Sequence, residues 1–159
     1  MPRKRPDDDV DFTALISELA SWNDGQGIDV DSWLIRVGSF EHAIAYAHLF
    51  WPSFTVFEDC VLFAGFSEEI FWGFMEQTRG DKRAVEAVMN HRHILDLFQG
   101  VSREPTEDTI VHFGRTLGDM WSCKLQRDFP GRTVVVSFAE DDIDDLLDYE
   151  ITFFQEHHV

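Results

Sequence analysis

The feature that most restricts the fold is a pair of alternating apolar segments near the C-terminal end, RTVVVSF at 132–138 and LLDYEITFF at 146–154. In an extended chain, every second side chain points to the same face. The apolar residues that share a face are Val134, Val136 and Phe138 in the first segment and Leu147, Tyr149, Ile151 and Phe153 in the second. This pattern predicts an antiparallel hairpin whose other face, with Asp148, Glu150 and Thr152, is turned to water.

Apolar spacing and capping residues upstream of the hairpin predict several helices, over 11–22, 40–51, 67–77, 81–90 and 106–125. The short segment SWLIRVG at 32–38 contains β-branched residues and predicts a strand. The Val- and Phe-rich segment at 53–65 predicts two more strands, joined by a tight turn at Glu58-Asp59.

These elements together predict one α+β domain over residues 11–159, after a flexible tail at 1–10 that contains two prolines. We expect a mostly antiparallel sheet of about four or five strands, which includes the C-terminal hairpin, with helices packed chiefly on one face. Gly114 and Gly118 lie four positions apart in the helix at 106–125, where each costs about 1 kcal/mol relative to Ala. Their spacing predicts the close approach of another helix, with a partner-docking groove as the alternative.

The formal net charge is −17, and it is unevenly distributed. Residues 7–78 contain 14 acids against Arg36 alone, and residues 133–159 contain eight acids and no Lys or Arg. Such a field repels nucleic acid and anionic membranes and attracts basic proteins. We therefore expect an acidic protein-interaction module, of inhibitor or immunity-like type, that binds a basic protein partner and makes no direct contact with nucleic acid or membrane. The alternative is that the charge only maintains solubility.

The acids expected to bind the partner lie in the connection between the two C-terminal strands and on the second strand. They are Glu140, Asp141, Asp142, Asp144, Asp145, Asp148 and Glu150. A calcium-binding loop is disfavoured because the required glycine and the distal glutamate spacing are absent after Gly131.

Apolar runs such as AIAYAHLFW are about half as long as the roughly 20 residues of a membrane span, so we expect a cytoplasmic location. Cys60 and Cys123 lie in apolar settings and are expected to be buried reduced thiols. Nucleotide-binding and hydrolase-elbow motifs are absent, so no cofactor is expected and a non-enzymatic protein is favoured over an enzyme.

Two alternatives remain for the function. The segment NHRHILD offers His91, His93 and Asp96 to a small metal-dependent enzyme, but both imidazoles point the same way only if this backbone is extended. Structural or surface histidines are the simpler interpretation. The helix at 67–77 is apolar over more than half its circumference, which indicates a homodimer contact as the other alternative.

Overall fold

The computed structural model describes residues 10–100, 104–141 and 143–156. The predicted N-terminal tail therefore falls almost wholly outside the described residues. Contacts within the chain divide it into two compact units, residues 1–43 and 44–159, and each is described by itself.

The first unit contains a four-residue helix α1 (Phe12–Leu15), a 3-10 helix η2 (Ser17–Ser21) and helix α2 (Val30–Val37). The predicted helix at 11–22 is thus interrupted, and the predicted strand at 32–38 is wrong. The carboxylate of Asp29 accepts a hydrogen bond from the Ser32 backbone N–H at 2.8 Å and caps the start of α2. This local cap outweighs the β-propensity of the β-branched residues.

The second unit begins within helix α3 (Phe40–Phe50) and continues into an antiparallel hairpin of β1 (Phe54–Phe57) and β2 (Cys60–Phe63). Glu58 and Asp59 have φ angles of 49° and 68°, which are the positive values that a tight two-residue turn requires. The predicted turn is confirmed.

The other predicted helices are also present. They are α4 (Glu68–Gln77), α5 (Lys82–Met89) and α6 (Glu107–Asp128). Side chains of Ser67, Asp81 and Thr106 each accept a backbone hydrogen bond at the helix start, as expected for N-caps. In the described part of the chain, no helix combines the length and the apolar character needed to cross a membrane.

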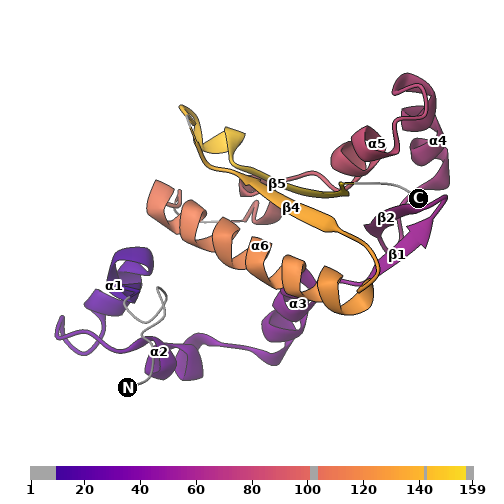
Figure 1. Ribbon diagram of the computed structural model, residues 1–159. Helices are drawn as coiled ribbons and strands as arrows, with labels where there is room; N and C mark the ends of the chain where they lie inside the picture. Colours follow the sequence, from indigo (N-terminus) through magenta and orange to yellow (C-terminus); the bar gives the residue numbers. More distant parts are fainter. Residues whose placement is uncertain (1–9, 101–103, 142, 157–159) are drawn as a thin grey trace, which may run out of the picture. The chain divides into compact units, whose positions relative to one another are not determined.

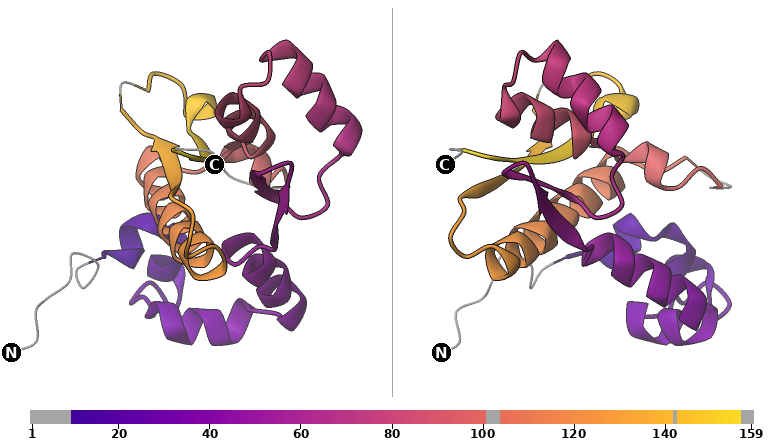
Figure 2. Two further views of the ribbon diagram at one scale, coloured as in Figure 1. Left: turned by 45° about the vertical axis from the view of Figure 1, so that its right-hand side comes forward. Right: turned by 90° about the vertical axis from the view of Figure 1, so that its right-hand side faces the viewer.

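The remaining strands form a second antiparallel sheet, of β3 (Arg92–His93), β4 (Val134–Ala139) and β5 (Glu150–Gln155), in the order β3-β5-β4. The C-terminal hairpin of β4 and β5 is confirmed. The expectation of one sheet is wrong, because β1 and β2 form their own two-stranded sheet (Figure 2). The first part of the predicted last strand is a 3-10 helix, η4 (Leu146–Asp148), and Leu147 is 58% exposed.

Helices cover both faces of the three-stranded sheet, not chiefly one (Figure 1). Ile151 and Phe153 are fully buried in the core that includes Leu117 and Trp121 of α6. On the other face, the Thr152 hydroxyl donates to the Ala87 carbonyl of α5 at 2.6 Å. The face of β5 expected to be open to water is therefore partly covered by α5.

The two glycines of α6 have different environments. A Cβ atom at Gly114 would lie 2.8 Å from Cε1 of Phe138 and closer still to the end of the ring. Gly114 thus permits the close approach of a strand side chain from β4, not of the helix that its spacing predicted. A Cβ atom at Gly118 would meet Ile151 Cδ1 at 3.7 Å, which is an ordinary contact.

Candidate functional site

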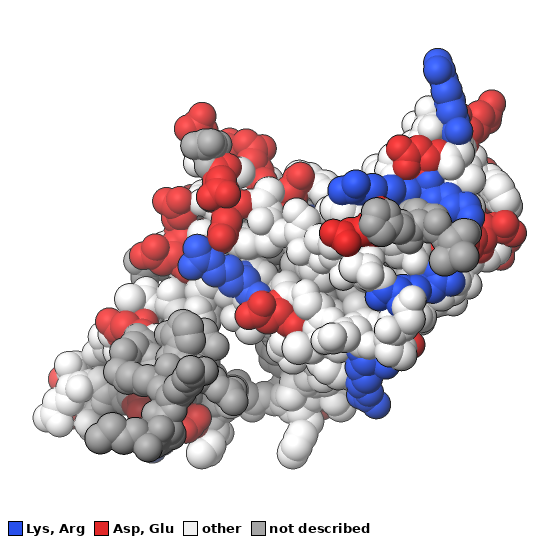
Figure 3. Space-filling view, in the orientation of Figure 1, with Lys and Arg blue, Asp and Glu red and all other residues white. Residues whose placement is uncertain are grey.

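Acidic side chains gather where β4 connects to β5 and where α6 begins. We call this surface the acidic end, and its described members are Glu107, Asp108, Glu140, Asp141, Asp144, Asp145, Asp148 and Glu150. The hydroxyl of Tyr149 donates to Glu107 Oε1 at 2.7 Å and so links the start of β5 to the first turn of α6. Figure 3 shows the carboxylates clustered over this end of the second unit, while Lys and Arg side chains are more frequent around α4 and α5.

The predicted partner-binding residues differ in what they contact. Glu140 Oε2 accepts from Arg115 Nε at 2.7 Å, and Asp145 accepts from the Leu147 backbone N–H at 2.9 Å, which caps η4. Glu150 forms a hydrogen bond with His91. The side chains of Asp141, Asp144 and Asp148 are exposed, and Asp142 lies outside the described residues.

Two pKa values are raised at the acidic end. The hydrogen bond to Glu107 raises the pKa of Tyr149 to about 12, and burial and the charges of Glu107 and Glu140 add to the effect. The hydrogen bond from Arg115 to Glu140 raises the pKa of Arg115, and the charges of Glu140 and Asp141 act in the same direction. Both shifts have the direction that a negative local potential produces.

A pair of histidines lies at the β3 edge of the same sheet. His93 pairs with Glu150 across the β3–β5 ladder, and His91 precedes the two residues of β3. His91 Nε2 is 2.7 Å from Glu150 Oε2, and His93 Nδ1 is 3.0 Å from the Leu147 carbonyl oxygen. The two imidazole centroids are 4.5 Å apart. The condition set by the sequence, an extended backbone that brings both rings to one side, is met here.

One ligand atom from each of His91, His93 and Glu150 lies within 4.8 Å of the other two. Asp96 instead lies on the 3-10 helix η3 (Leu95–Leu97), is exposed, and is not part of this group. Glu150 was expected at the partner surface, and its proximity to the histidines was missed. His91 and Glu150 are 59 positions apart, so only the register of β3 against β5 could have revealed it.

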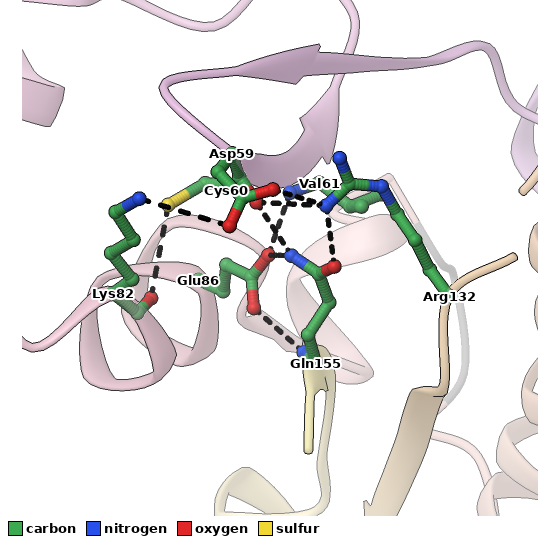
Figure 4. A network of polar contacts seen from close by, with 7 residues as sticks. All are labelled: Asp59, Cys60, Val61, Lys82, Glu86, Arg132 and Gln155. Carbon is green, nitrogen blue, oxygen red and sulfur yellow. Dashed lines mark hydrogen bonds and ion pairs between the residues drawn. The ribbon is translucent and has the colours of Figure 1, made fainter. Parts of the chain in front are cut away.

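A second polar cluster has Glu86 and Gln155 buried at its centre and connects several elements (Figure 4). Glu86, which is 0% exposed, accepts from the backbone N–H groups of Val61 and Gln155, each at 2.6 Å, and from Gln155 Nε2 at 2.7 Å. Arg132 Nη1 donates to Asp59 Oδ1 and to Gln155 Oε1, both at 2.7 Å. These contacts join α5, β2, β5 and the β1–β2 turn, so we assign the cluster a structural role.

The two cysteines have different exposures. Cys60 is buried, as expected, and burial together with the charge of Glu86 raises the pKa of its thiol to about 12. Its thiol is therefore neutral and unreactive at physiological pH. Cys123 is exposed, contrary to the expectation that both thiols are buried, because its position on α6 faces away from the sheet.

Comparison with protein-family models gave no match, and searches among curated proteins and solved structures likewise found no similar protein.

Proposed function

We propose that the protein is an interaction module, of inhibitor or immunity-like type, whose acidic end captures a basic protein partner. The observation that most supports this function is that carboxylates from two distant segments lie together. The hydrogen bond from Tyr149 to Glu107 holds the start of α6 against the start of β5. The acids thus form one surface although they are far apart in the sequence. Arg115 adds positive charge here, and it is paired with Glu140.

Several acids of this surface belong to helices or cap them. Glu107 and Asp108 occupy the first turn of a 22-residue helix, and Asp145 caps η4. Charges held in place in this way need little reordering on binding, which lowers its entropic cost. Their long-range attraction accelerates encounter with a basic partner and is screened beyond about 8 Å at physiological salt. Proteins that bind nucleic acid have basic surfaces of the kind that the acidic end would attract, and they are the partner class we favour.

The test compares the wild type with the triple variant Asp141→Asn, Asp144→Asn and Asp148→Asn, which neutralises exposed acids and leaves the Asp145 cap intact. The matched control, Glu68→Gln, Glu69→Gln and Glu76→Gln, changes the net charge equally at exposed positions on α4. Each protein is used as bait in its native cell extract, and bound proteins are identified and quantified. We expect a basic protein to be retained by the wild type and the control and depleted with the triple variant.

Binding kinetics with that purified protein give the second measurement. The triple variant should associate more slowly by about tenfold at low salt, with a smaller change in dissociation rate, since steering acts mainly on encounter. Equal association rates for the wild type and the triple variant across a salt titration would show that the acidic end is only a solvated surface.

The metal-dependent enzyme is the second candidate function. The grouping of His91, His93 and Glu150 favours it, since two imidazoles and a carboxylate are a common ligand set for catalytic metals. Its first requirement is a bound metal ion.

A further inference from the structure

Three potential metal ligands converge from two neighbouring strands at the β3 edge of the three-stranded sheet. His91 and His93 come from β3 and the residue before it, and Glu150 begins β5. Each contributes an atom within 4.8 Å of the others. Zn–N and Zn–O bonds of about 2.0–2.2 Å place tetrahedral ligands about 3.3 Å apart, so modest side-chain rotation brings the three atoms to one ion.

The contact of His93 with the backbone determines which of its nitrogens can bind a metal. A carbonyl oxygen is only an acceptor, so Nδ1 of His93 must donate its proton to Leu147 across the 3.0 Å contact. In the neutral imidazole this leaves Nε2 unprotonated, with its lone pair available. Metal-binding histidines commonly have this arrangement, in which a backbone carbonyl orients the ring and fixes its tautomer.

Separate hydrogen bonds orient the two imidazoles, that of His91 to Glu150 and that of His93 to Leu147, and they leave the ring centroids 4.5 Å apart. An ion would replace the hydrogen bond between His91 and Glu150, because its 2.7 Å length is shorter than the separation of two ligands of one metal. The side chains of His91 and Glu150 are 31% and 44% exposed, so an ion can enter from solvent and keep water as a fourth ligand.

We infer that His91, His93 and Glu150 form a binding site for a divalent transition-metal ion of the Zn²⁺ class. Two imidazoles with one carboxylate suit Zn²⁺ and Co²⁺ better than Ca²⁺ or Mg²⁺, which prefer oxygen ligands. The neighbouring acidic end lowers the electrostatic cost of bringing a cation here. This inference goes beyond the proposed function, because partner capture does not require a metal.

The experiment uses the full chain after treatment with a chelator and dialysis. Co²⁺ is added while visible absorption is followed, Zn²⁺ is used to displace it, and the melting temperature is measured with and without Zn²⁺. We expect one Co²⁺ per chain with the absorption bands of a low-coordinate nitrogen and oxygen site. Zn²⁺ should raise the melting temperature, because an ion that binds the folded state stabilises it by mass action.

The variants His91→Ala, His93→Ala and Glu150→Gln should each weaken Co²⁺ binding by about tenfold or more, since even outer-shell changes cost that much. His93→Gln is a second variant that keeps a polar side chain, and the metal-free melting curve verifies that each protein is folded. Asp96→Asn is the control for the nearby acid, and His157→Ala with His158→Ala is the control for histidines outside the described residues. Both controls should bind as the wild type does.

Two results would overturn the inference. One is the absence of any change in absorption or melting temperature at saturating metal. The other is binding that persists in the folded His91 and His93 variants and is lost in the His157 and His158 variant, which would place the ion elsewhere. Neither result bears on partner capture, because the capture test changes Asp141, Asp144 and Asp148, which are not in the group of three ligands.

Discussion

Tyr149 shows how one residue connects burial, charge and the position of the acidic end. Its ring is buried in the core, at 2% exposure for the residue, while its hydroxyl reaches Glu107. The apolar alternation in the sequence predicted the buried ring. It could not predict the acceptor, because Glu107 is 42 positions away and lies on a helix whose placement depends on the whole core.

We predict that Tyr149 gives the protein a pH-dependent stability at alkaline pH. Its pKa is raised to about 12 in the folded chain, against about 10 in an unfolded one. A group whose pKa is higher in the folded state contributes stability that is complete below the unfolded value. This contribution is therefore lost as pH rises from about 10 towards 12.

The measurement compares urea unfolding of the wild type and Tyr149→Phe from pH 8 upwards. The wild type should be more stable below about pH 10, and the difference should shrink above it. The absorbance of the wild type should also show a tyrosinate step near pH 12 that Tyr149→Phe lacks. A stability difference that does not vary with pH would contradict this role of Tyr149.

At the scale of elements, features specified by nearby residues were predictable and those specified by long-range packing were not. The caps at Ser67, Asp81 and Thr106 lie beside the helices they begin, and these helices were predicted correctly. The segment at 32–38 contains β-branched residues that are typical of a strand, but the cap at Asp29 begins a helix there. The pairing of β3 with β5 joins segments almost 60 residues apart, so no local sequence pattern predicts it.

The packing of α6 on β4 leads to a prediction about its two glycines. Gly114→Ala should destabilise the fold by about 1–3 kcal/mol, because the new Cβ atom would overlap the Phe138 ring and overpacking outweighs the gain in helix propensity. Gly118→Ala meets only ordinary contacts and should stabilise by up to about 1 kcal/mol.

Urea unfolding of the two variants beside the wild type checks this pair, and each is the control for the other. Both alanines have the same intrinsic propensity, so only the environment of each position distinguishes them. Equal effects of the same sign would mean that Phe138 moves freely away from α6.

At the scale of the whole molecule, charge and exposed apolar surface act in opposite ways on association. A net charge of −17 attracts a basic partner but makes two copies of the chain repel each other. Ile70 and Trp72 on α4 are 54% and 49% exposed, which leaves apolar area that a second copy could cover. Salt screens both electrostatic effects.

We therefore predict that a homodimer formed through α4 is favoured by added salt, whereas capture of a basic partner at the acidic end is weakened by it. Light scattering at increasing protein concentration, in low and high salt, measures the first effect. Ile70→Ser with Trp72→Ser should keep the chain monomeric, because the change removes the apolar area that the contact would bury. Val88→Ser, at an exposed apolar position on α5, is the control and should dimerise as the wild type does. A monomeric mass of the wild type at every concentration and salt would exclude the α4 contact and leave the acidic end as the surface for association.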